Sequence, residues 1–252
     1  MNPAESQQCA LDELENISGK PVVLQEDATL PNLARIQIAS SERPVHVLSY
    51  NPAASQELPY LVCFQCGLAE RSVRSARDEQ FNVASTHDTY RQVETLVREK
   101  KAVPAHIVKT YSKMITDGLG TQLRSMPVGI RVDRCLYIEH PELRDLQRSC
   151  AERSMKQNVG CLHPSIRAQA PELFIHATAS MNAAFALSWG HLWREDDYVV
   201  PYRLAGFFEQ GVALLNALES IPAPATHDRE LVSTWATLLG IDHLYQVGPL
   251  GL

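Results

Sequence analysis

Two neighbouring stretches decide the fold class: VHVLSYNP at residues 45–52 and LPYLVCFQCGLA at residues 58–69. The first alternates apolar and polar side chains apart from one slip, which predicts a strand that ends at Asn51-Pro52. The second is apolar at almost every position, which predicts a helix that is buried on most sides and has Pro59 in its first turn. A strand followed by a buried helix indicates an α+β protein.

The stretches on the N-terminal side of this pair also favour strands. Residues 22–24 and 35–38 are β-type, and with 45–50 they predict a small antiparallel sheet of three to four strands near the N-terminus, packed on a mainly helical body. Residues 128–132 and 135–138 look extended, and supply the fourth strand or a hairpin.

Beyond the sheet the pattern is helical, with breaks at glycine and proline. We expect a tail or a short helix over 1–18 and a single domain over 19–252, in which 19–138 holds the sheet with its helices and 139–252 is helical. The predicted helices after residue 76 are 87–101, 104–117, 140–158, 171–190, 202–219 and 228–239.

The composition indicates an ordinary folded protein. Of 252 residues, 45% are hydrophobic and 21% are charged, and the formal charge is −6. Acidic and basic side chains are spread along the chain, which argues against a nucleic-acid partner. There is no long apolar run and no signal peptide, so we expect no membrane association, a cytoplasmic location and six reduced cysteines.

The order of strand, Asn-Pro stop, loop and buried helix resembles the ImmA/IrrE-type zincin peptidases, whose active-site helix reads His-Glu-x-Gly-His. In that motif two histidines on one helix face bind zinc, and the glutamate is the general base. When the motif is aligned on Gly67, its two histidine positions fall on Phe64 and Leu68, and its glutamate position falls on Gln65. None of these side chains can bind zinc or take a proton, so the resemblance implies a scaffold that has lost its metal and its peptidase mechanism.

Zincins hold a peptide along an edge strand, and the resemblance therefore implies a docking groove between 45–50 and the helix 58–76. The expected partner is another protein or peptide that pairs with this strand, and the candidate binding residues are Val45, Val47, Ser49 and Tyr60. Family membership implies a role in bacterial regulation, stress response or mobile-element defence. Assembly into homo- or hetero-oligomers is compatible with this expectation.

Two alternatives stay open. Glu172 and His176 share a helix face and, with His163, could form the acid/base pair of an enzyme of unrecognised type. The Cys63-x-x-Cys66 pair, with Cys161 and His163, could instead form a structural zinc site.

Aromatic residues near the end of the helix 171–190 are a further candidate partner surface. Core packing is the default interpretation for this small-residue helix, and the alternative uses Trp189, Trp193 and Tyr198 as anchors. No phosphate-binding loop, dinucleotide fingerprint or hydrolase elbow is present, so we expect no cofactor. The sequence thus favours a non-catalytic, protein-binding scaffold over an enzyme.

Overall fold

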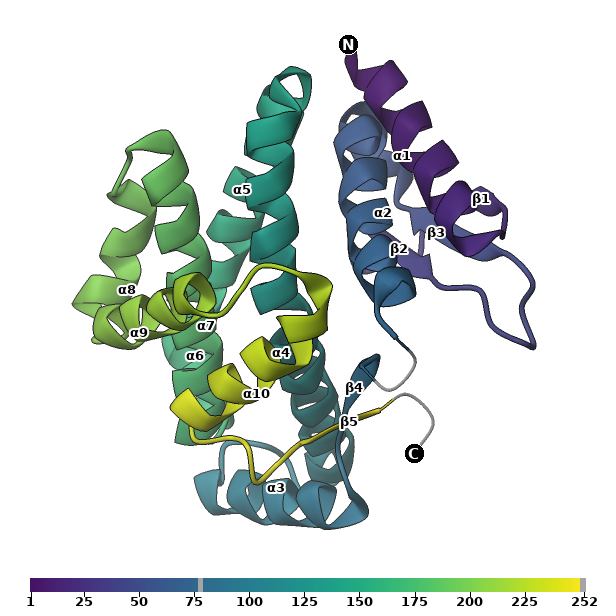
Figure 1. Ribbon diagram of the computed structural model, residues 1–252. Helices are drawn as coiled ribbons and strands as arrows, with labels where there is room; N and C mark the ends of the chain where they lie inside the picture. The colour runs from purple at the N-terminus through teal and green to yellow at the C-terminus, as the bar shows by residue number, and fades with distance from the viewer. Residues whose placement is uncertain (77–78, 250–252) are drawn as a thin grey trace. The chain divides into compact units, whose positions relative to one another are not determined.

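The computed structural model describes residues 1–76 and 79–249, with only the main chain of residue 249. The chain divides into two compact units, each built from two separate segments. Unit 1 contains residues 1–76 and 131–152, and unit 2 contains the described residues of 77–130 and 153–252. The fold class is α+β, as predicted: a small sheet near the N-terminus accompanies a body that is mostly helical (Figure 1).

Unit 1 begins with a helix, a three-stranded sheet and a second helix. To these it adds the last residues of the long helix α4 (Val108–Glu139), a 3-10 turn η2 (Pro141–Leu143) and the first part of α5 (Arg144–Asn158). Its other elements are α1 (Pro3–Ser18), β1 (Val22–Glu26), β2 (Ala34–Gln37), β3 (His46–Tyr50), the 3-10 helix η1 (Pro52–Glu57) and α2 (Leu58–Arg74).

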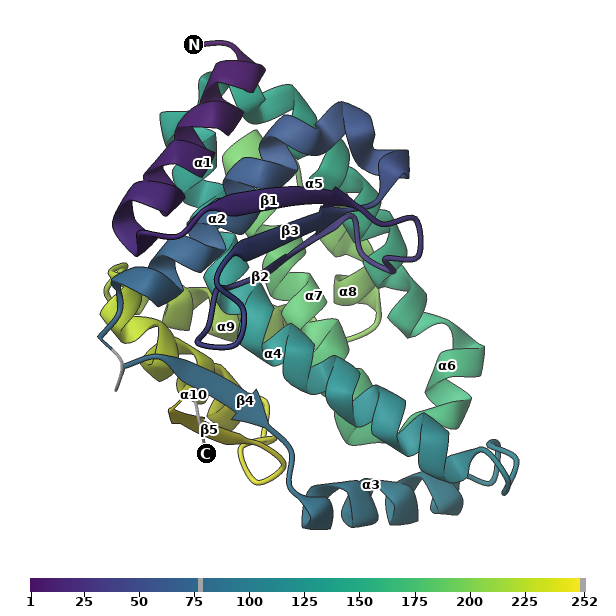
Figure 2. The ribbon, with the colours of Figure 1, turned by 90° about the vertical axis from the view of Figure 1, so that its right-hand side faces the viewer.

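The sheet of unit 1 is mixed, and its strand order is β1-β3-β2 (Figure 2). β3 pairs with β1 in parallel and with β2 in antiparallel orientation. The prediction of a purely antiparallel sheet was wrong, because the segment between β1 and β2 skips one strand position and β3 then fills the gap. The strand positions themselves were predicted correctly.

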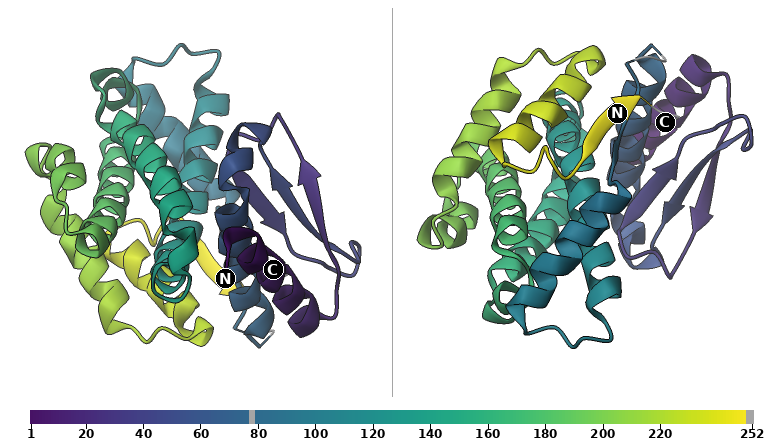
Figure 3. Two further views of the ribbon diagram at one scale, coloured as in Figure 1. Left: turned by 90° about the horizontal axis from the view of Figure 1, so that it is seen from above. Right: turned by 90° about the horizontal axis from the view of Figure 1, so that it is seen from below.

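Helices α1 and α2 lie together on one face of this sheet (Figure 3). Leu14 of α1, Leu48 of β3 and Val62 of α2 have no exposed surface and belong to one apolar core. Of the two expectations for residues 1–18, the structure therefore has the helix. A capping box starts it, in which the Asn2 side chain accepts the Glu5 N–H and the Glu5 carboxylate accepts the Asn2 N–H.

Unit 2 is a set of helices with one short strand pair. Strands β4 and β5 pair in antiparallel orientation although more than 160 residues separate them, and the sequence did not predict them. The elements are β4 (Phe81–Ala84), α3 (His87–Lys100), α4 (Val108–Glu139, up to Ile130), the end of α5 (Arg144–Asn158), η3 (Val159–Leu162), α6 (Pro164–Gln169), α7 (Glu172–Trp193), η4 (Asp197–Val199), α8 (Val200–Leu204), α9 (Phe208–Ser220), η5 (Ala225–His227), α10 (Asp228–Leu238) and β5 (Gln246–Pro249).

The core of unit 2 is built around α7, which is buried along most of its length. Glycine at position 211 lets α9 cross close to α7, because a Cβ added at Gly211 would lie 2.7 Å from the Cβ of Ala183. Small residues on α7 thus serve helix packing, which was the default interpretation of that stretch.

Helix α4 corrects two predictions. It runs through the expected break at 118–120 and includes residues 128–138, which were expected to be extended. Residues 127–133 are all buried, including the charged Arg131 and Asp133, so this segment lacks the one-sided pattern of a surface helix. Periodicity alone cannot distinguish such a segment from a strand. Pro127 lies inside the helix without ending it.

Among the described residues, no helix combines the length and the apolar character needed to cross a bilayer.

Candidate functional site

The helix that resembles the zincin active-site helix is α2, and its three motif positions lie on the half-buried side. Phe64 and Leu68 pack against the core of unit 1. The Phe64 ring also lies 5.9 Å from the ring of Tyr60, one turn earlier. Both side chains therefore have a packing role and neither offers a metal ligand.

Gln65, which the sequence alignment places at the general-base position of the zincin motif, makes two hydrogen bonds to the main chain of β2. Its Oε1 accepts the N–H of Ile36 at 3.1 Å, and its Nε2 donates to the carbonyl of Ala34 at 3.3 Å. Both backbone groups lie on the side of β2 that faces away from β3, because Leu33 and Arg35 face β3. The Gln65 amide thus occupies the outer edge of β2.

Gly67, on which the resemblance was aligned, has a packing reason of its own. A Cβ at this position would lie 2.9 Å from Cγ1 of Val132, on the part of α4 that belongs to unit 1. The missing side chain lets α2 and this part of α4 approach closely. The glycine is explained by packing without reference to a metal motif.

The predicted docking strand is not an edge, which corrects the prediction for residues 45–50. β3 lies between β1 and β2 and is paired on both sides, so no further strand can add to it. Ser49 is 4% exposed and Tyr60 is 5% exposed, which leaves neither available to a partner. Val45 and Val47 are half-buried.

The free edge of the sheet is β1. His46 donates to the carbonyl of Pro21, and Asp27 donates to the carbonyl of Tyr50, so the odd-numbered residues of this segment face β3. The N–H and C=O groups of the even-numbered residues therefore face away from the sheet. The Glu15 carboxylate accepts one of them, the N–H of Val22, at 2.6 Å.

The remaining outward-facing groups of β1 are the carbonyl of Val22 and the N–H and C=O groups of Leu24 and Glu26. In the described part of the chain these groups have no hydrogen-bond partner. Val23 is 46% exposed and Leu24 is 37% exposed, so the edge is open to solvent and partly apolar. In the sequence, the apolar run Val22-Val23-Leu24 was a signal for a strand. It did not show that this strand is an edge, because the strand order is known only from the structure.

The cysteine and histidine candidates for zinc are not brought together. Cys63 and Cys66 are buried in unit 1, whereas Cys161 and His163 belong to unit 2. Burial raises the pKa of Cys63 to about 12 and also raises that of Cys66. Across residues 1–76 and 79–249, no three His, Cys, Asp or Glu side chains are grouped so that they could hold a metal ion.

The candidate acid/base pair on α7 is also not assembled. Glu172 lies 3.8 Å from Arg167 in a salt bridge that is open to solvent. His176 stacks edge-on against Phe207, with 5.8 Å between the ring centroids. His163 caps α6 by accepting the N–H of Ser165. Each side chain thus has a separate structural partner.

The aromatic residues near the end of α7 form a packed row. Trp189 is only 1% exposed, and its ring centroid lies 4.9 Å from that of Trp193, which in turn lies 5.8 Å from that of Tyr198. Trp189 cannot anchor a partner because it is already in the core.

A buried carboxyl group in unit 1 was missed by the sequence analysis. Asp133 is 5% exposed and accepts hydrogen bonds from Tyr60 at 2.7 Å and from Nε2 of Gln147 at 3.2 Å. Burial raises its pKa to about 7, although both hydrogen bonds act in the opposite direction. The Oε1 atom of Gln147 is buried and has no hydrogen-bond partner among the described residues.

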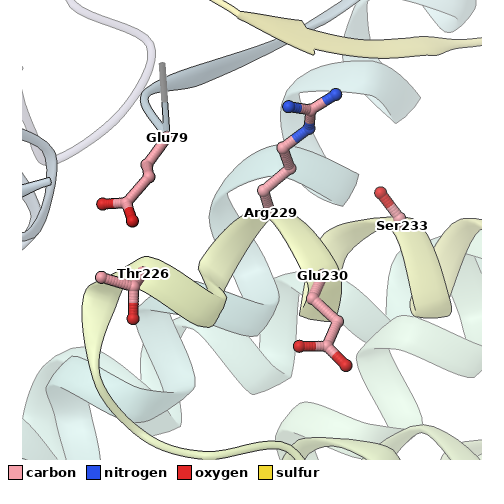
Figure 4. Close-up of a pocket in the computed structure, with 5 residues that line it drawn as sticks. All are labelled: Glu79, Thr226, Arg229, Glu230 and Ser233. Atoms are coloured by element: carbon pink, nitrogen blue, oxygen red, sulfur yellow. The ribbon is translucent and has the colours of Figure 1, made fainter. Parts of the chain in front are cut away.

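A hollow of about 350 Å³ opens on unit 2 (Figure 4). Arg229 and Glu230 extend from α10 in opposite directions, and Glu230 is paired with His227 at 3.0 Å. The lining side chains do not converge on one point, and we assign no chemistry to this hollow. Its lining residues are Glu79, Thr226, Arg229, Glu230 and Ser233.

Comparison with known proteins adds no relative. No protein-family model matches the chain, no curated protein matches it, and no solved structure matches it.

Proposed function

We propose that unit 1 is a non-catalytic protein-binding module that takes up an extended segment of another protein along the free edge of β1. The observation that carries the proposal is the row of outward-facing, unpaired main-chain groups of Leu24 and Glu26 beside the exposed side chains of Val23 and Leu24. An exposed strand edge with unpaired N–H and C=O groups is a template for an added strand.

The side chains around β1 indicate what kind of segment would pair there. Val23 and Leu24 favour β-branched side chains that carry methyl groups, such as valine and threonine, on both faces of the added strand, because a strand presents alternate side chains to opposite faces. Glu26 and Asp27 stand at the end of β1, and hydrogen bonds from Thr29 lower the pKa of Asp27, which keeps it charged. The partner segment is therefore extended, apolar in its middle and basic at the end that lies beside Glu26.

The relation to zincins remains part of the proposal. It is supported by the order of sheet and helix in unit 1, and by the position of Gln65 on α2 against an edge strand. The edge next to the helix is β2, not the strand expected from the sequence. A role in bacterial regulation, stress response or mobile-element defence would follow from this kinship and is proposed on that ground alone.

The experiment that tests the proposal is calorimetric titration of the whole chain with the acetylated, amidated peptide Lys-Thr-Val-Thr-Val-Thr-Lys. We expect saturable binding that is lost in Leu24→Pro, because proline removes the outward N–H of Leu24 without touching the bonds to β3. Leu24→Thr is the matched control, since it keeps the N–H and should weaken binding by less than tenfold.

A second peptide tests whether main-chain pairing carries the binding. The same peptide with N-methyl groups on alternate residues keeps its side chains but cannot donate hydrogen bonds along one edge. Binding of this peptide at unchanged affinity, or unchanged binding to Leu24→Pro, would show that β1 is not the docking edge. Self-association of the free chain in sedimentation, abolished by Leu24→Pro, would identify a second copy as the occupant instead.

A further inference from the structure

Helix side chains cover different parts of the two sheet edges in unit 1, and on β1 the Glu15 carboxylate covers only the N–H of Val22, the first residue of the strand. β1 leaves the main-chain groups of Leu24 and Glu26 open, whereas on β2 the side chain of Gln65 already occupies the N–H of Ile36 and the C=O of Ala34. The difference comes from a helix residue and not from the strands. Gln65 is therefore the residue that makes the sheet asymmetric.

The bonds of Gln65 reproduce those of a strand residue. In a parallel pair, one residue donates its N–H to the carbonyl of residue i−1 on its neighbour and accepts the N–H of residue i+1. The amide of Gln65 does the same to Ala34 and Ile36, at 3.3 Å and 3.1 Å. It thus stands in for one residue of an added strand.

The helix that carries Gln65 is held in place. Cys66, next to it, has no exposed surface, and Gly67 allows the close approach of Val132. The α2 main chain therefore cannot withdraw easily, and only rotation of the half-buried Gln65 side chain can open the edge of β2. That opening would break both hydrogen bonds to β2, which makes it costly but reversible.

We infer that Gln65 determines which edge of the sheet takes up a partner: its amide closes β2 and leaves β1 as the docking edge. The inference rests on the proposed function for the role of β1, but the closure of β2 by Gln65 stands on its own hydrogen bonds. The partner class is the same extended, apolar segment.

The test compares the number of peptides bound by the wild type and by Gln65→Met. Methionine keeps the length and volume of the side chain and removes both hydrogen bonds. With the peptide Lys-Thr-Val-Thr-Val-Thr-Lys in calorimetry, we expect one site per chain in the wild type and two in the variant. Gln92→Met, on an exposed position of α3, is the matched control and should leave one site.

The outcomes separate the inference from the proposed function. If the wild type binds no peptide and Gln65→Met binds one, the proposed docking at β1 is wrong, and the inference that Gln65 closes the edge of β2 is supported. The same number of sites in both proteins would overturn the inference, whichever number it is.

A measurement on the wild type covers the case in which the variant does not fold. In hydrogen–deuterium exchange followed by NMR, the Ile36 amide should exchange at least tenfold more slowly than the Leu24 amide, because only Ile36 has a partner. Equal exchange of the two amides would show that Gln65 does not hold the edge, and would overturn the inference.

Discussion

The hydroxyl group of Tyr60 lies 2.7 Å from Oδ1 of Asp133, and both residues are 5% exposed in the core of unit 1. A carboxyl group in such a position loses its hydration when the chain folds, which favours the protonated form. The raised pKa of Asp133, about 7, is a consequence of this burial. It gives the protein a titration near neutral pH that the sequence did not indicate.

Replacing Asp133 by asparagine should change the pH dependence of stability. Between pH about 4, where an unfolded aspartate titrates, and pH about 7, the folded state holds a proton that the unfolded state has released, so stability falls as pH rises through this window. Asp133→Asn removes this titration. From pH 4 to pH 8 the free energy of unfolding of the variant should therefore rise relative to that of the wild type by on the order of 2–4 kcal/mol.

Urea denaturation of both proteins at several pH values checks this expectation. Asp145→Asn, an exposed carboxylate on α5, is the control and should follow the wild type. If Asp133→Asn and the wild type show parallel pH profiles, Asp133 does not titrate in this range.

Gly67→Ala and Gly118→Ala should have opposite effects on stability although both lie inside helices. A Cβ at Gly118 meets nothing within 4 Å, so alanine should stabilise by about 0.5–1 kcal/mol through its helix propensity. At Gly67 the added Cβ would lie 2.9 Å from Val132, and the resulting strain should outweigh that gain. Thermal unfolding of the two variants measures the contrast.

Shortening the opposing side chain provides the control for this pair. Val132→Ala removes the atom that the new methyl group would meet, so Gly67→Ala should cost less in a Val132→Ala background than in the wild type. Additive effects of the two substitutions would mean that the contact is not the cause.

Gly211→Ala tests the close crossing of α7 and α9 in unit 2. Its Cβ would lie 2.7 Å from the Cβ of Ala183 and 3.1 Å from main-chain atoms of α7, which cannot rotate away. We expect a loss of about 1–3 kcal/mol in the free energy of unfolding. A substitution without effect in chemical denaturation would show that the two helices can separate at low cost.

The six thiols should differ in reactivity towards a disulfide reagent such as DTNB. Cys9 is exposed, whereas Cys63, Cys66 and Cys150 are buried. Cys161 is half-buried, and burial raises its pKa. Cys135 is exposed, but desolvation and the neighbouring Glu139 raise its pKa to about 11, which leaves little thiolate at neutral pH.

The native protein should therefore show one fast-reacting thiol, and Cys9→Ser should abolish the fast phase. The denatured protein should react with all six. A fast phase that survives in Cys9→Ser would mean that another cysteine is more accessible than its burial indicates.

The sequence predicted the positions of the strands of unit 1 and of helices α3, α7 and α10, because each has a clear periodicity or a clear capping signal. It failed where pairing depends on distant partners. The parallel pairing of β1 with β3 follows from the path of the chain between strands, and β4 pairs with β5 from the other end of the sequence. Local patterns do not contain this information.

At the candidate site, too, the sequence could predict some features and not others. Phe64, Gln65 and Leu68 could be placed on α2 from the sequence, and the prediction that the chain lacks the zincin peptidase mechanism rests on the chemistry of these three side chains. The hydrogen bonds of Gln65 could not be predicted, since they require knowing that Ala34 and Ile36 turn their main chain away from β3. For Asp133, its position directly after the stretch 128–132, which is apolar apart from Arg131, was the only available signal.

Unit 1 is completed by residues 131–152, which follow the first segment of unit 2 in the chain. During translation, the sheet and its two helices leave the ribosome well before Leu143, which is fully buried in their shared core. At a translation rate of about 5–20 residues per second, this apolar surface of the nascent chain stays uncovered for several seconds. In the cell, that interval is the period in which a chaperone would be needed.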